Sequence, residues 1–110
     1  MRDHDYWVYI VTNKTNSTLY IGMTNNLKRR VQEHQSSKVK GFTQRYSLKR
    51  LVWFEHFRDV RDAIACEKKL KGWLRARKVA LIAEKNPRWG DLSEEWFEEV
   101  GSVDTGNAFL

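Results

Sequence analysis

The stretch WVYIVTNKTNSTLYIG, residues 7–22, decides the fold because it predicts a β-hairpin. Two runs of aromatic and β-branched side chains, which favour strands, flank six polar residues that are typical of a turn. If the hairpin folds about its middle, Tyr9 lies opposite Tyr20, and both phenols stand on one face because strand side chains alternate. The opposite face then carries Val8, Ile10, Leu19 and Ile21.

The segment after the hairpin predicts an amphipathic helix. Asn25 or Asn26 can cap its start, since asparagine side chains accept hydrogen bonds from free helical N–H groups. Four side chains recur at i, i+3, i+4 and i+7 and should form the stripe that faces the sheet: Leu27, Arg30, Val31 and His34.

Residues 51–57 indicate a third strand, and Asp59 then starts the longest helical pattern. The expected inward stripe of this pattern is Ala63, Ile64, Glu67, Leu70 and Leu74. A helical continuation through residues 79–84 should end before Asn86 and Pro87, because the residue preceding a proline leaves the helical region. This order of elements predicts an α+β domain with a small three-stranded antiparallel sheet flanked by helices.

Charge divides the chain into two parts. Residues 24–88 hold eighteen Lys or Arg against six Asp or Glu, whereas residues 91–110 hold six acids and no base. We therefore expect one domain over residues 1–90 and an acidic extension over residues 91–110 that is partly helical and then frayed. The basic block is a candidate surface for a polyanion, and a solvated basic face without a partner explains its composition equally well.

The sparse cysteine content argues for an intracellular protein. Cys66 is the only cysteine among 110 residues, so the chain has no disulfide framework and no cysteine-based zinc site. His4, His34 and His56 lack the spacing of zinc ligands. No apolar run reaches the length of a membrane span. We expect a soluble cytoplasmic protein with no membrane contact.

Two charged residues lie where apolar ones are expected. Glu67 is in line with the apolar side chains of the long helix, so it either pairs with a nearby base or serves as a magnesium ligand. Arg30 lies on the inner stripe of the first helix, where its stem covers apolar surface or its guanidinium meets a phosphate. His34, one turn further, is a structural histidine or a hydrogen-bond partner of a phosphate or a tyrosine.

The remaining candidates each have a structural and a chemical interpretation. Tyr9 and Tyr20 form a cross-strand aromatic pair, or one phenol acts as a base after a metal and an arginine lower its pKa. Gly22 is a turn glycine, or it ends the strand so that phosphate approaches the backbone. Asn86 is a helix stop or an amide that braces a site.

Taken in order, these residues resemble the active-site set of the GIY-YIG nuclease family, whose members cut nucleic-acid backbones with one divalent metal. The resemblance is strongest to small stand-alone members related to the nuclease domain of the bacterial excision-repair incision protein, and it covers roughly residues 6–90. Two positions depart from the pattern: Val8 replaces the first glycine, and Met23 stands where some relatives carry lysine. The resemblance implies that the site consists of the motif residues Tyr9, Tyr20 and Gly22, with Arg30, His34, Glu67 and Asn86.

The resemblance implies a metal-dependent endonuclease that acts on DNA, branched or damaged DNA included, with structure-selective or weakly sequence-specific cutting and a place in DNA repair. Mg²⁺ or Mn²⁺ would bind at Glu67. The expected contacts to nucleic acid are Gly22, Lys28, Arg29, Lys38, Lys40, Arg45, Lys68 and Lys71. The alternatives are a nucleic-acid-binding module of the same fold with little or no activity, and a protein-interaction adaptor that uses Trp96 and Phe97.

Overall fold

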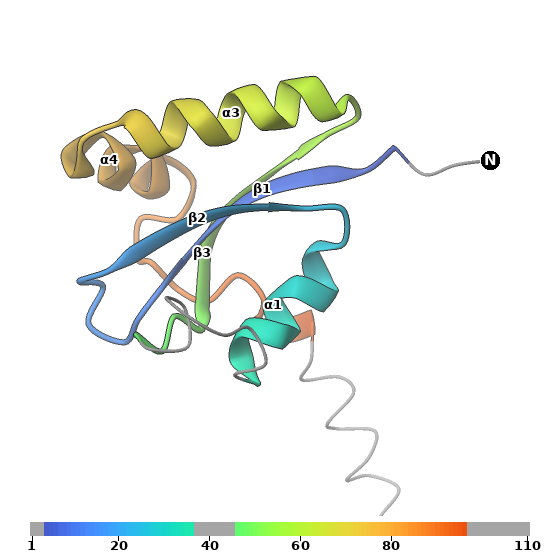
Figure 1. Ribbon diagram of the computed structural model, residues 1–110. Coiled ribbons are helices and arrows are strands. Elements are labelled where there is room, and N and C mark those ends of the chain that lie inside the picture. The colour runs from blue at the N-terminus through green and yellow to red at the C-terminus, as the bar shows by residue number, and fades with distance from the viewer. Residues whose placement is uncertain (1–3, 37–45, 97–110) are drawn as a thin grey trace, which may run out of the picture.

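The computed structural model describes residues 4–36 and 46–96, which form a three-stranded antiparallel sheet and the helices that cover it. The strands are β1 (Tyr6–Thr12), β2 (Leu19–Thr24) and β3 (Arg50–Phe57). They are arranged in the order β2-β1-β3, so β2 and β3 are the edge strands (Figure 1). The predicted α+β class and the predicted sheet are confirmed.

Helices cover both faces of the sheet. Figure 1 shows α1 (Leu27–Gln35) on one side, and α3 (Val60–Gly72) with α4 (Arg75–Lys85) on the other. The side chain of Asn26 accepts a hydrogen bond from the Arg29 N–H at 3.0 Å, so the predicted cap of α1 is present. Among the helices of the described residues, none has the length and apolar character that a membrane span requires.

The sheet separates two hydrophobic clusters. The cluster under α3 and α4 contains Val8, Ile10, Ile21, Val52, Trp53, Ala63, Leu70 and Ile82, with Leu19 packed against it. The cluster under α1 contains Tyr9, Val11, Leu27, Val31, Leu48 and Leu51. The predicted division of the hairpin into a tyrosine face and an aliphatic face is therefore confirmed.

The predicted hairpin register is wrong by two residues. Tyr9 lies opposite Gly22, and Tyr20 lies opposite Val11. The turn is asymmetric because the Asn13 side chain accepts hydrogen bonds from the N–H groups of residues 17 and 18, at 2.9 and 3.2 Å. A shift of two residues keeps every side chain on its face, so both tyrosines still share one face of the sheet.

Gly22 does not end a strand, contrary to expectation, and instead lies within β2. A Cβ atom at this position would lie 2.5 Å from both Cζ and Oη of Tyr9. The ring of Tyr9 therefore lies directly over the backbone of β2, and any larger residue at position 22 would displace it.

The long helical pattern is broken into two helices, which the sequence analysis did not foresee. Trp73 and Leu74 are extended, with ψ angles of 151° and 159°, and they redirect the chain between α3 and α4. Leu74 is consequently 82% exposed, and Ile64 is also exposed. The expected inward stripe holds for Ala63 and Leu70 and is wrong for these two residues.

Residues 86–96 fasten the end of α4 to β3. The buried Asn86 amide donates to the carbonyl groups of Val52 and Gly90 at 3.1 and 2.9 Å. Leu92 N–H donates to the Leu51 carbonyl at 2.8 Å, and residues 94–96 begin a further helical turn. The expected partly helical extension over residues 91–110 is described only as far as residue 96, so Phe97 lies outside the described residues, and the domain boundary at residue 90 stays a prediction.

Gly22→Ala should destabilise the protein by about 1–3 kcal/mol, because the new methyl group overpacks against Tyr9. Gly72→Ala is the matched control, since a Cβ atom there would meet nothing within 4 Å. Urea unfolding of the two variants measures the difference. Equal midpoints would show that the Tyr9 ring does not need a glycine beneath it.

Candidate active site

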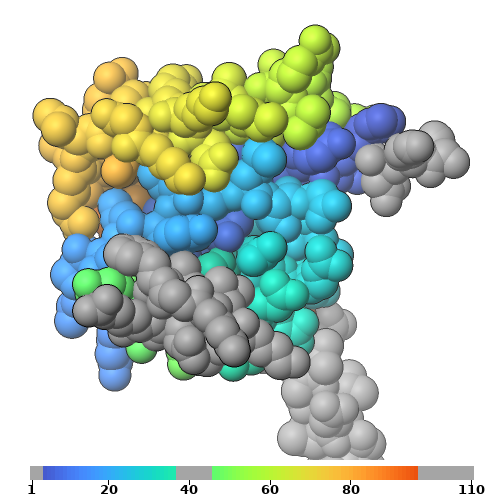
Figure 2. Space-filling view, in the orientation of Figure 1, coloured from blue at the N-terminus to red at the C-terminus, as the bar shows by residue number. Residues whose placement is uncertain are grey.

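Tyr9 places a hydroxyl group at the β2 edge of the sheet. Its side chain is buried, and its hydroxyl lies 3.0 Å from Nε2 of His34 on α1. Figure 2 shows this edge, where β2 crosses between α3 above and α1 below. The hydrogen bond joins two strands and a helix at one point, because Tyr9 belongs to β1 and its ring covers β2.

The two rings joined by this hydrogen bond also pack against the ring of Tyr20. The ring centroids of Tyr9 and Tyr20 lie 6.4 Å apart, and that of His34 lies 5.6 Å from Tyr9 and 5.9 Å from Tyr20. Both contacts of His34 are edge-to-face, which is a favourable aromatic geometry. The structure thus brings the two motif tyrosines and the predicted histidine into one cluster, hereafter the Tyr9 cluster (Tyr9, Tyr20 and His34).

Arg30 lies at the rim of the Tyr9 cluster rather than beneath the helix. Its side chain is 37% exposed, and its Nε atom lies 3.6 Å from Oε1 of Glu33. The sequence analysis missed Glu33, although its i,i+3 and i,i+4 spacing to Arg30 and Arg29 is the signal for such pairs. The arginine therefore has solvent access, as a residue that meets a phosphate requires.

Glu67 approaches from α3, on the other side of β2. Its side chain is 21% exposed, and Oε2 lies 3.1 Å from Nζ of Lys71. The carboxylate is therefore paired, as the structural interpretation of the sequence required, and it remains accessible. Lys71, expected at nucleic acid, neutralises this carboxylate here.

The pKa of Tyr9 is raised in the protein without a metal, and its lowering by a metal together with an arginine stays a prediction. Burial is the largest cause because it disfavours the phenolate, and the nearby Tyr20 raises the pKa further. Arg30 acts in the opposite sense, whereas Glu67 raises the pKa again. Groups on α1 and α3 are thus close enough to act on one hydroxyl, which is protonated in this structure.

His34 is neutral near pH 7. Burial and the positive charge of Arg30 lower its pKa from 6.5 to about 4. A neutral imidazole can accept a proton, and a phenol is a better donor than acceptor, so we assign the Tyr9 hydroxyl as the donor to Nε2. The other ring nitrogen, Nδ1, is buried and has no partner among the described residues.

Asn86 lies away from the Tyr9 cluster. Its amide bonds to β3, which lies at the opposite edge of the sheet from β2. The side-chain oxygen of Asn86 also accepts a hydrogen bond from the Gly90 N–H at 3.2 Å. Asn86 therefore braces the fold.

The structure describes only some of the residues that were predicted to contact nucleic acid. Lys28, Arg29 and Lys68 are exposed on α1 and α3, which flank the β2 edge. Gly22 is covered by Tyr9 and offers little backbone to a ligand. Three further expected contacts lie outside the described residues: Lys38, Lys40 and Arg45.

The donor set around Glu67 suits a hard cation that keeps most of its water. Residues 4–36 and 46–96 contain no group of three or more His, Cys, Asp or Glu side chains that could hold a metal. A closed zinc site needs such a group, whereas Mg²⁺ is bound through one or two carboxylates, waters and substrate phosphates. The accessible Glu67 carboxylate therefore fits magnesium.

Comparisons with known proteins agree on the family and the fold. Residues 5–80 match the GIY-YIG catalytic domain. A UPF0213 protein of Clostridium perfringens is 34% identical over 93 residues, covering 84% of this chain and 94% of that protein. The UPF0213 protein YazA of Bacillus subtilis is 33% identical over 85 residues, covering 77% and 85% of the two chains. The solution NMR structure of a UPF0213 protein from Bacillus halodurans has a TM-score of 0.53 and 27% identity, covering 82% of this chain and 95% of that chain.

The stability of the protein should fall on acidification because of His34. Its folded pKa of about 4 lies below the ordinary 6.5, so its contribution is complete above pH 6.5 and is lost as the pH falls towards 4. Between pH 7.5 and 5 the loss should be about 2 kcal/mol. Urea unfolding of the wild type and of His34→Gln at both pH values measures the contribution of His34 to this loss of stability. An identical pH dependence in both proteins would show that His34 is not neutral and buried.

Proposed function

Because the chain belongs to the GIY-YIG family, a nuclease family, we propose that it is a metal-dependent endonuclease that hydrolyses the backbone of DNA. The observation that carries the proposal is the convergence on the Tyr9 hydroxyl of His34, Arg30 and Glu67, from two helices on opposite faces of the sheet. A fold held together only by packing has no need of these groups around one edge.

A divalent cation bound at Glu67 would supply positive charge that stabilises the negative charge developing on the phosphate. In the free protein the Glu67 carboxylate is paired with Lys71, and a cation would have to replace that lysine. The pair is partly exposed, so its separation is inexpensive: such i,i+4 pairs are worth about 0.3–0.5 kcal/mol.

Arg30 binds the phosphate in this mechanism. Its guanidinium offers several donors in a fixed geometry, which suits the oxygens of a phosphate in the transition state. The contact to Glu33 at 3.6 Å is long and solvent-exposed, so a phosphate can displace it readily.

Tyr9 and His34 move the proton of the attacking water. In the protein without a cation, burial raises the pKa of Tyr9 and keeps the phenol protonated. Water gives its proton to the Tyr9 oxygen while the phenolic proton passes to Nε2 of His34, over the 3.0 Å hydrogen bond. Burial is the main reason that His34 is a weak base in the free protein, and the negative phosphate at Arg30 offsets the further contribution of the arginine charge.

The substrate surface extends from the β2 edge onto α1 and α3. Exposed Lys28, Arg29 and Lys68 attract the DNA backbone without reading its sequence. Contacts to the backbone alone favour structure-selective or weakly sequence-specific cutting of DNA, branched or damaged DNA included. Such binding weakens steeply with salt, because counterions are released from the DNA.

The exposed cations Lys28, Arg29 and Lys68 would serve equally in one alternative, a nucleic-acid-binding module of the same fold with little or no catalytic activity. The two functions share the same basic surface. They differ in turnover alone, so a cleavage assay separates them.

Glu67→Gln should fold, bind DNA at least as well as the wild type, and show no metal-dependent cutting. The substitution keeps the size of the side chain and removes the charge that Mg²⁺ requires. Purified protein is incubated with linear, nicked and branched DNA in Mg²⁺, Mn²⁺ or EDTA, and melting is followed on the same samples.

Glu84→Gln is the matched control, because Glu84 is an exposed glutamate on α4. It should cut as the wild type does. Full cutting by a stable Glu67→Gln protein would remove the metal role of Glu67, and absence of cutting by the wild type on every DNA would favour the binding module.

A further inference from the structure

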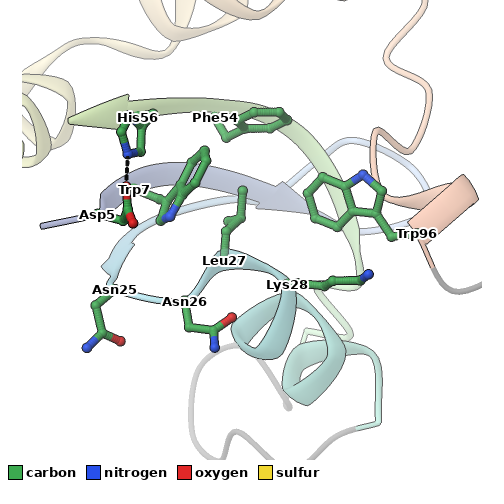
Figure 3. Close-up of a pocket in the computed structure, with 9 residues that line it drawn as sticks. All are labelled: Asp5, Trp7, Asn25, Asn26, Leu27, Lys28, Phe54, His56 and Trp96. Atoms are coloured by element: carbon green, nitrogen blue, oxygen red, sulfur yellow. Dashed lines mark hydrogen bonds and ion pairs between the residues drawn. The ribbon is translucent and has the colours of Figure 1, made fainter. Parts of the chain in front are cut away.

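A hollow of about 700 Å³ lies on the α1 face of the sheet, separate from the Tyr9 cluster. Figure 3 shows that its walls come from β1, β3, the start of α1 and the segment that follows Ser93. Its volume is within the range of pockets that take small ligands.

Flat rings form one wall of this hollow. The ring centroids of Trp7 and Phe54 lie 5.9 Å apart, and those of Phe54 and Trp96 also lie 5.9 Å apart (Figure 3). All three side chains are partly exposed rather than sealed in the core. Leu27 completes the wall from α1. We call this row of Trp7, Phe54 and Trp96 with Leu27 the aromatic pocket.

The rim of the aromatic pocket favours a negatively charged ligand. Lys28 and Asn25 are exposed there, at the N-terminal end of α1, whose first turn contains no acidic residue. A helix N-terminus attracts anions, and Lys28 adds a full charge. Asp5, the one carboxylate among the described residues that line the pocket, lies 2.6 Å from Nε2 of His56 and is held by that hydrogen bond.

The aromatic pocket shares two elements, β1 and α1, with the candidate active site. Trp7 and Tyr9 project from the same face of β1, and residues two apart in a strand are separated by about 7 Å. The helix that lines the pocket with Leu27 and Lys28 also carries Arg30. We therefore infer that a DNA strand held at Arg30 can also reach the pocket on the same face of the sheet.

We propose that the aromatic pocket receives an unpaired base of the DNA substrate, while the adjoining phosphate lies at Lys28. The planes of Trp7 and Phe54 are inclined by 65°, and those of Phe54 and Trp96 by 59°, so the base stacks on one of these rings and meets the next edge-on. The inference rests on the proposed function and narrows its substrate to DNA with an unpaired nucleotide near the cut. Flat rings with a cation at the rim match the two parts of a nucleotide, a flat base and an anionic phosphate. Stacking of a base on protein aromatics is worth about 1–3 kcal/mol.

Removal of the base alone tests this proposal. Fluorescence anisotropy measures binding of two duplexes with a short single-stranded overhang, one with normal bases and one with abasic sites in the overhang. The charge and the backbone are the same in both. The wild type should bind the abasic DNA about tenfold more weakly, which corresponds to the stacking of one base. EDTA is present throughout, so the result does not depend on cutting.

Trp96→Leu and Trp7→Leu should each bring the ratio of the two affinities close to one. Trp73→Leu is the control, because Trp73 lies between α3 and α4, away from the pocket. Its ring centroid is 4.3 Å from Cζ of Arg77. This control variant should keep the tenfold preference. Two pocket variants are used because one of them could fold poorly, which melting would detect. The affinity ratio of the other variant then tests the proposal.

Equal binding of normal and abasic DNA by the wild type would overturn the proposal, as would a preference that both pocket variants retain. The first result would assign the pocket to another occupant, such as a peptide segment. Neither result bears on metal-dependent cutting, which the Glu67→Gln assay measures independently.

Discussion

The contact between the Tyr9 ring and the backbone of Gly22 is the constraint on which the site depends. Because position 22 has no side chain, the ring can cross from β1 over β2 and bring its hydroxyl to the edge of the sheet. There His34 holds it at 3.0 Å. Without this crossing, the hydroxyl would have no route to the edge where Arg30 and Glu67 meet from opposite faces.

Burial gives the site its resting state. It raises the pKa of Tyr9 and lowers that of His34, so both partners of the hydrogen bond are neutral in the free protein. The charged groups, Arg30 and Glu67, stay at the accessible rim in pairs that are inexpensive to separate. The substrate thus meets a rigid neutral centre with charges around it that can exchange their partners. The aromatic pocket extends this surface to the bases.

Local sequence patterns predicted the features that depend on neighbours in the chain. These include the hairpin and its two faces, the Asn26 cap and the third strand. The register could not be predicted, because it depends on how the Asn13 side chain folds the turn. The role of Gly22 and the pKa of Tyr9 depend on packing between strands, which no local pattern records. The exposure of Leu74 follows from a helix break that periodicity alone does not show.

The most direct test is a double-mutant cycle on the rate of DNA cleavage with Tyr9→Phe and His34→Gln, under single-turnover conditions. Tyr9→Phe removes only the oxygen, so DNA affinity should hold while the rate falls by more than about a hundredfold. If the two residues move one proton together, the double variant should be no slower than the slower single variant. The account would be contradicted if the rate of the double variant were reduced by the product of the two single reductions. A Tyr9→Phe protein that cuts at the normal rate would also contradict it.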